Sequence, residues 1–255
     1  MDTTYAETHH SEKTPEIRTL SVTAPYEWLR IGWKDFRQAI LPSLTLGLLF
    51  VVAGYVLVSA SWNLPLLTIT FVTGFLLVAP ALALGFYEMS RRIHEGKSVG
   101  FNSLIYSWKN HGWSVLLFGL VLGVVMVAWG RLTGLLVALS LPVIGPFSDL
   151  LSWQALTDPG FIVLYMVVGF VLAAVVFSLS VVSIPMLIDR KVDVVTAAMT
   201  SLRAVAKNPG VMFRWAFIIA LLTILGMFTV FIGLLIIMPL LGHASWHAYK
   251  QTVAD

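Results

Sequence analysis

Two histidines near the carboxyl end of the chain have the spacing that is most suggestive of chemistry. His243 and His247 lie four residues apart in the stretch "PLLGHASWHAYKQ", and a helix would place both imidazoles on one face. Two imidazoles at this spacing can share a zinc or copper ion. The metalloprotease pattern needs a glutamate directly after the first histidine, and Ala244 stands there instead.

The neighbours of these histidines favour a simpler interpretation. Trp246 and Lys250 belong to the same segment, and side chains of these types at the end of an apolar helix extend toward lipid headgroups. Haem ligation by both histidines is disfavoured, because two imidazoles four residues apart cannot reach opposite faces of one iron. We therefore predict a membrane-surface role for Trp246 and Lys250 and no cofactor. A zinc, copper or haem site at His243 and His247 is the alternative.

The composition predicts a membrane protein built from helices. The chain is 58% hydrophobic and 11% charged, whereas a soluble domain is roughly 25% charged. Uncharged stretches separate Arg37 from Glu88 and Arg214 from Lys250, and about 20 apolar residues suffice to cross the hydrocarbon core. Long unbroken apolar stretches are typical of helices rather than of barrel strands. The expected fold is an all-α polytopic membrane helix bundle.

The positions of turns within these stretches predict about six transmembrane helices. Asn63 and Pro65 mark a turn in the first stretch. A tight turn around 226–229 would divide the last stretch into two spans. The loop between the third and fourth spans, residues 133–160, is expected to hold a short helix near Phe147 and Leu151. The expected spans cover residues 38–60, 64–87, 114–132, 161–185, 209–226 and 229–249.

The basic residues predict the orientation. With six spans, every lysine and arginine except Arg131 falls on the side of the termini. Such a bias is typical of cytoplasmic loops, so we expect the cytoplasmic (inner) membrane with both termini in the cytoplasm. Arg131 is the single intramembrane charge, and we expect it close to the outer interface, where an arginine can extend to headgroups or pair with Asp149 or Asp158.

Three similar segments precede the first, third and fifth expected spans. They read "LRIGWKD", "LIYSWKN" and "LRAVAKN", and each ends in a lysine followed by Asp or Asn. Their apolar spacing is typical of helices at a membrane surface, with Lys34, Lys109 and Lys207 toward the headgroups. A proline follows within the second span of each unit. After a flexible cytoplasmic tail at 1–22, we therefore expect one membrane domain at 23–252, in pseudo-repeats of about 23–95, 96–190 and 191–252.

Several classes of function are disfavoured by what the sequence lacks. The chain has no cysteine, which excludes disulfides, thiolate metal sites and a cysteine nucleophile. Its net charge of +3 is too small to suggest nucleic-acid binding. No phosphate-binding loop, Ser–His–Asp pattern or pair of carboxylates within a span occurs. We expect no catalysis.

Three motifs give the chain a family resemblance. With "GWKDF" at 32–36, "AWGRL" at 128–132 and the terminal His-x-x-Trp-His-x-Tyr-Lys segment, residues 20–252 resemble a bacterial integral-membrane family, the domain of unknown function 2189. Such proteins have sometimes been labelled as candidates for cytochrome c oxidase subunit I. That oxidase subunit has twelve spans with histidines on several facing helices, whereas His243 and His247 of this chain lie together at the inner end of its last expected span.

These observations lead to three alternatives for the function. The first is a non-catalytic structural membrane protein that binds lipids, a membrane-protein partner or a second copy of itself. The second is a respiratory redox or metal-binding protein, or an assembly factor, that uses His243 and His247. The third is a small transporter, which would need polar groups at mid-span, where the sequence offers mainly hydroxyls such as Thr70 and Ser178.

Overall fold

The structure is a computed structural model that describes residues 15–140 and 157–254. All of its regular elements are helices, which confirms the expected all-α fold. The expected short helix near Phe147 lies outside the described residues. The helices are α1 (Ala24–Gln38), α2 (Ile40–Ser61), α3 (Pro65–Leu82), α4 (Leu84–His94), α5 (Phe101–Ser140), α7 (Pro159–Ser180), α8 (Ser183–Asp189), α9 (Val194–Lys207), α10 (Pro209–Phe228) and α11 (Leu234–Thr252).

Prolines mark several helix boundaries. Pro159 and Pro209 stand at the first position of α7 and α10, where the missing N–H costs nothing. Pro80 lies inside α3, and that helix ends two residues later. Pro185 follows the break between α7 and α8. Pro239, in contrast, lies inside an uninterrupted α11, so the three expected units do not end alike.

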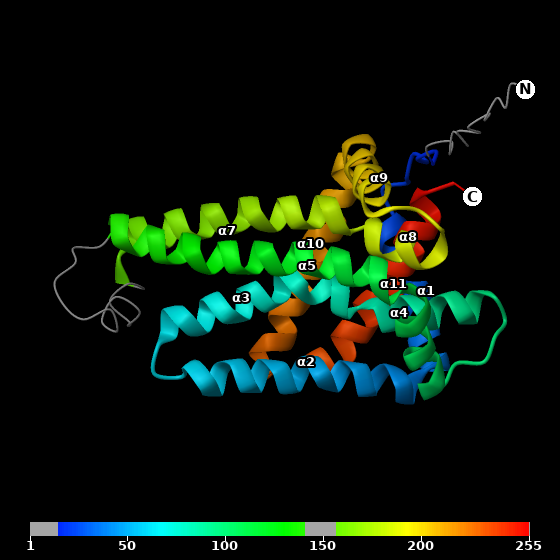
Figure 1. Cartoon of the computed structure of the whole chain (residues 1–255), viewed down its shortest axis with the longest axis horizontal. Coiled ribbons are helices and arrows are strands. Elements are labelled where there is room, and N and C mark those ends of the chain that lie inside the picture. Colours follow the sequence, from blue (N-terminus) through cyan, green and yellow to red (C-terminus); the bar gives the residue numbers. More distant parts are fainter. Residues whose placement is uncertain (1–14, 141–156, 255) are drawn as a thin grey trace, which may run out of the picture.

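Four long helices run side by side along the molecule. In Figure 1, α2, α3, α5 and α7 follow the long axis, and α10 and α11 form an oblique hairpin behind them. The short helices α1, α4, α8 and α9 gather at the end of the bundle that carries both described termini. All four of these short helices therefore lie at one end of the long helices.

Five segments of the described chain are long and apolar enough to cross a membrane. They are Ile40–Ser61, Pro65–His94, Leu116–Leu139, Pro159–Asp189 and Pro209–Phe228. The sixth expected span, within α11, is not among them, so the count of six is not confirmed. The reason is that the second half of α11 carries the polar residues of the histidine segment and packs against protein.

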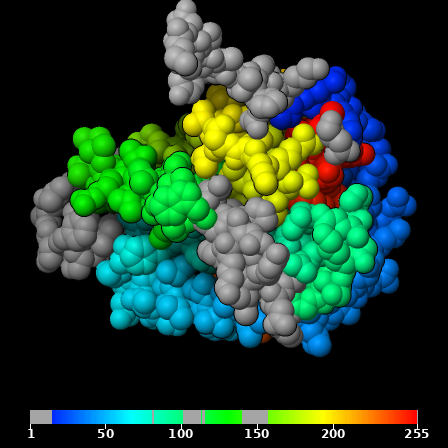
Figure 2. Space-filling view, turned by 45° about the vertical axis from the view of Figure 1, so that its right-hand side comes forward, coloured from blue at the N-terminus to red at the C-terminus, as the bar shows by residue number. Residues whose placement is uncertain are grey.

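The two ends of the described chain are bound to each other. Ile17 pairs with Val253, and the amide of Arg18 donates to the carbonyl of Thr252 at 2.8 Å. Figure 2 shows the N-terminal segment, the α8–α9 region and the C-terminal segment meeting on one side of the molecule. The expected flexible tail at 1–22 is therefore too long, because residues from Ile17 onward are hydrogen-bonded to the body of the protein.

The main hydrophobic core lies at this same end. It contains Trp28, Trp215, Trp246 and Tyr249, all with at most 1% of their surface exposed. Trp28 and Trp215 make an edge-to-face contact with ring centroids 5.4 Å apart. Burial of such large rings contributes most of the packing energy of a small core, so this end of the bundle is its best-packed part.

The third expected span differs from its prediction in length. The structure has one continuous helix from Phe101 to Ser140, with no boundary between the expected surface helix and the span. The helix also continues nine residues beyond Arg131, or about 13 Å at the helical rise. Arg131 therefore lies within the apolar stretch Leu116–Leu139 rather than at its end.

Candidate functional site

The histidine face of α11 packs directly against α1. A Cβ atom at Gly32 would lie only 2.6 Å from the backbone nitrogen of Ala244, so the absence of a side chain lets the two helices approach at backbone distance. Ala244 is itself fully buried. This close approach brings the polar side chains of α1 and α11 within hydrogen-bonding range.

His243 is fully buried between α2 and α4. Its Nε2 atom lies 2.9 Å from the hydroxyl of Ser43, and its Nδ1 atom lies 2.8 Å from the hydroxyl of Ser90. Ser90 donates its own proton to Asp35 at 2.6 Å, so it must accept a proton from His243. The network thereby assigns the proton to Nδ1 and leaves Nε2 as the acceptor for Ser43.

Asp35 connects this network to the second histidine. Its Oδ2 atom accepts from Ser90 and lies 2.7 Å from Nε2 of His247. Asp35 is 4% exposed, whereas the His247 side chain is 14% exposed. A continuous chain of hydrogen bonds thus runs from Ser43 through His243, Ser90 and Asp35 to His247.

The electrostatics keep His243 neutral. The pKa of His243 is lowered to about 4, mainly by burial, while the negative charge of Asp35 opposes the shift and the proximity of His247 adds to it. The hydroxyls of Ser43 and Ser90 have no exposed surface. The network can order protons and join helices α1, α2, α4 and α11, but in this structure no hydroxyl is open to a substrate. A fully satisfied buried network of this kind specifies one packing arrangement.

We expect the stability to fall in acid because of His243. The folded pKa of about 4 lies below the ordinary 6.5, so between these values the unfolded chain binds a proton that the folded chain does not. The free energy of unfolding should therefore drop as the pH falls through this window, by up to about 1.4 kcal/mol per pH unit. Thermal unfolding in detergent at several pH values measures the slope. His243→Gln should flatten it and the exposed-site control His94→Gln should not. Equal slopes in all three proteins would contradict this assignment.

The expected surface location of these side chains is wrong for His243 and Trp246. Both are buried in protein, with 0% and 1% of their surface exposed, because α1, α2 and α4 cover the helix face that the sequence suggested was open to headgroups. Nor do the described residues supply a set of ligands for the alternative, a metal site. Both nitrogens of His243 are engaged by serines, and the described residues contain no group of three or more His, Asp or Glu side chains placed to hold a metal ion.

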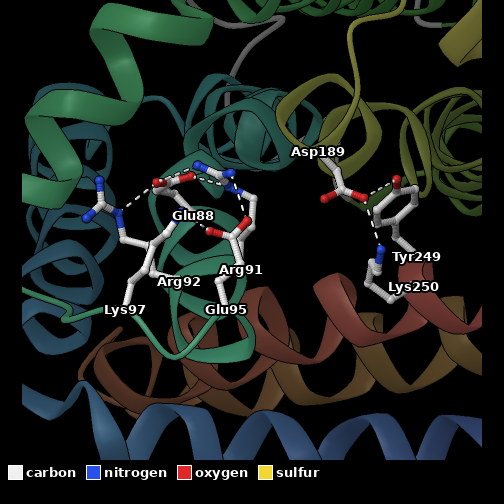
Figure 3. Close-up of polar contacts among 8 residues, drawn as sticks. All are labelled: Glu88, Arg91, Arg92, Glu95, Lys97, Asp189, Tyr249 and Lys250. Carbon is white, nitrogen blue, oxygen red and sulfur yellow. Dashed lines mark hydrogen bonds and ion pairs between the residues drawn. The ribbon is translucent and has the colours of Figure 1, made fainter. Parts of the chain in front are cut away.

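Two further polar groups lie at this end of the bundle, one within α4 and one between α8 and α11. Glu88 is fully buried and accepts from Arg91 and Arg92, each at 2.8 Å, at spacings of three and four residues along the helix. Figure 3 shows Asp189 facing Tyr249 and Lys250. The Tyr249 hydroxyl donates to Asp189 at 2.7 Å and Lys250 lies 3.2 Å from the same carboxylate. Lys250 is thus part of an ion pair within the protein.

The remaining predicted site residues are distributed over several surfaces. Lys34 is exposed on α1, and Arg131 is exposed on α5. Lys207 donates to the carbonyl of Ile17 at 2.6 Å. Lys109 belongs to α5, but its side chain lies outside the described part of the structure. The described side chains of Lys34, Arg131 and Lys207 make no polar contact with one another, so these three residues form no single site.

Sequence reasoning missed the residues that hold His243, namely Asp35, Ser43 and Ser90. One available signal was the Asp or Asn that follows each repeated lysine. Asp35 and its counterpart Asn208 are both about 5% exposed or less, and Asn208 bonds to Leu20 and Arg18. The Asp or Asn that follows the repeated lysine is thus buried and hydrogen-bonded to another segment in the first and third of the three repeats.

One comparison with known proteins returned a match. Residues 66–189 match the family model DUF2189, described as a predicted integral membrane protein. No curated protein and no solved structure matches the chain. The matched range contains "AWGRL" but neither "GWKDF" nor the histidine segment. The expected family resemblance is confirmed for this range: residues 66–189 are similar to the DUF2189 family of predicted integral membrane proteins.

Proposed function

We propose that this integral membrane protein is a non-catalytic lipid-binding protein of the cytoplasmic (inner) membrane, with both termini in the cytoplasm. Its ligands are anionic headgroups held at the basic face of α1. The proposal involves no resident cofactor and no nucleic acid. A second copy or another membrane protein would bind elsewhere than on this face.

The exposed stripe along α1 is the observation that supports the proposal. Arg30, Lys34 and Arg37 follow one another at helical spacing, and all three are exposed. None of them makes an ion pair with another described residue. Trp33 is 40% exposed on the same helix, and Leu41, four residues after Arg37, is 69% exposed at the start of α2. A row of cations leading into an apolar span matches the order of headgroup and acyl chain in a lipid.

The charge distribution supports the proposed orientation. The α1 stripe, the α4 arginines and Arg190 all lie at the end of the bundle where the termini meet. The excess of basic residues at this end is what the positive-inside rule associates with the cytoplasmic face. The inner leaflet is also the one that attracts basic segments, because of its negative surface potential.

We expect the double variant Lys34→Gln/Arg37→Gln to bind anionic lipid roughly thirtyfold more weakly, because each basic side chain near an anionic surface contributes about 1 kcal/mol. The measurement is phosphatidylglycerol retained by the purified protein, quantified by mass spectrometry across a lipid titration. The control Lys97→Gln/Lys191→Gln removes the same charge from exposed positions outside α1. An equal loss in both variants would show that only net charge matters, and no loss in either would refute the proposal.

The redox alternative makes a different prediction for the same preparation. A respiratory or metal-binding protein would show visible absorbance or stoichiometric zinc, copper or iron, and would lose it on replacement of His243 and His247. We expect a colourless protein without stoichiometric transition metal, because both nitrogens of His243 already have serine partners. Absorbance spectra and metal analysis of the membrane-extracted protein distinguish these outcomes.

A further inference from the structure

The hairpin formed by α10 and α11 begins and ends on the same side of the bundle. At its start, Asn208 accepts from the amide of Leu20 at 2.9 Å and donates to the carbonyl of Arg18 at 3.0 Å. At its end, Thr252 accepts from the amide of Arg18 at 2.8 Å. Since one short segment holds both ends, either both helices cross the membrane or neither does.

The tip of the hairpin stops short of the far ends of its neighbours. A Cβ at Gly54 would lie 2.5 Å from the ring of Phe231, and Tyr55 contacts the same ring at 6.1 Å between centroids. Helix α2 continues seven residues beyond Gly54, which is about 10 Å. On α3, Phe231 shares an apolar hollow with Val72 and Phe75, which again lie well inside that helix. Figure 1 shows the α10–α11 tip level with the middle of α2.

Four of the six backbone amides from Thr229 to Leu234 are hydrogen-bonded within the turn. The Thr229 hydroxyl accepts from the amide of Gly233 and donates to the carbonyl of Gly226, both at 2.7 Å. The amides of Phe231, Ile232 and Leu234 donate to carbonyls within the turn. Val230 and Phe231 adopt φ values of 55° and 65°, a conformation that is costly for such residues and needs support from its surroundings. Internal hydrogen bonding is what hydrocarbon requires of a turn.

Three apolar side chains of the tip face outward, while Phe231 packs inward against α2. Phe228 is 82% exposed, Val230 is 58% exposed and Ile232 is 60% exposed. The α2–α3 turn differs, since it presents Trp62 and Asn63, which are residues of a membrane–water interface. A largely apolar turn at mid-bundle depth, with most of its amides bonded internally, fits acyl chains better than water.

We infer that α10 and α11 form a re-entrant hairpin, whose tip at 228–232 contacts lipid acyl chains in the interior of the bilayer. The chain then crosses the membrane four times, through α2, α3–α4, α5 and α7–α8. Helix α10 is apolar enough to span but enters obliquely and turns back. This inference is independent of the proposed headgroup binding, because it concerns a different surface.

Single cysteines test the inference, since the chain has none of its own. Ile232→Cys probes the tip, Asn63→Cys the α2–α3 turn and Lys97→Cys the opposite end of the bundle. With a membrane-impermeant maleimide, Asn63→Cys and Lys97→Cys should react from opposite sides of the membrane. Ile232→Cys should react from neither side until detergent is added. Reaction of Ile232→Cys from the side of Asn63 would mean that both helices cross, and reaction from the side of Lys97 would place the tip outside the membrane.

A depth measurement separates burial in lipid from burial in protein. An environment-sensitive fluorophore attached at Ile232→Cys in liposomes should be quenched more by lipids with a nitroxide deep on the acyl chain than by lipids with a headgroup nitroxide. The same fluorophore at Asn63→Cys should show the reverse order. Stronger headgroup quenching at position 232, or no quenching by either lipid, would overturn the inference. Phe228→Cys gives the same readout if Ile232→Cys does not accumulate.

Discussion

Replacing Gly32 with valine is expected to push α1 away from α11 and to destabilise the protein by about 3 kcal/mol or more. The new Cβ would meet the backbone nitrogen of Ala244 at 2.6 Å, and backbone atoms of a packed helix cannot move aside as a flexible side chain can. Separation of the helices would also stretch the Asp35–His247 contact. Thermal unfolding in detergent and elution as a monodisperse species measure the effect.

Gly123→Val is the matched control for this prediction. Gly123 also lies inside a helix, but nothing stands within 4 Å of a Cβ built there. The same substitution should therefore change the free energy of unfolding by less than about 1 kcal/mol. If both variants unfold like the parent protein, α1 and α11 are not in backbone contact, and the geometry of the histidine network would have to be reconsidered.

The Asp35→Ala variant is expected to lose about 3 kcal/mol, because each of the two buried donors that lose their acceptor costs about 1–3 kcal/mol. Asp35 is almost fully buried and accepts from both Ser90 and His247. Its removal would leave a hydroxyl and an imidazole without their acceptor inside the protein. Unfolding by denaturant in detergent or in bicelles gives the change in free energy.

Asp193→Ala is the appropriate comparison, since it removes an aspartate that is also hydrogen-bonded but exposed. Asp193 caps the start of α9 by accepting from the amides of Val195 and Thr196, and loss of such a cap costs about 1 kcal/mol. The Asp35 variant should therefore be the clearly less stable of the two. Equal losses would mean that the buried network adds little beyond an ordinary helix cap.

The amino-acid sequence by itself determined the membrane class, the helical fold and most of the span boundaries. The physical reason is local: an uncharged stretch longer than the hydrocarbon thickness has few alternatives to a membrane helix, and the turn at Asn63 and the proline that begins α10 interrupt those stretches visibly. The ion pairs of Glu88 with Arg91 and Arg92 were predictable for the same reason, because their spacing alone brings them together on one helix.

Only the tertiary structure decided what surrounds the histidine segment and how deep the last hairpin reaches. Ser43 and His243 are 200 positions apart, and Asp35 and His247 are 212 apart, so no local pattern could pair them. In a sequence, polar residues that follow an apolar stretch form the same pattern whether lipid headgroups or other parts of the protein cover them. Likewise, the apolarity of α10 shows that it tolerates lipid, but whether it crosses depends on its inclination against α2 and α3, which is set by the packing of Phe231 on Gly54.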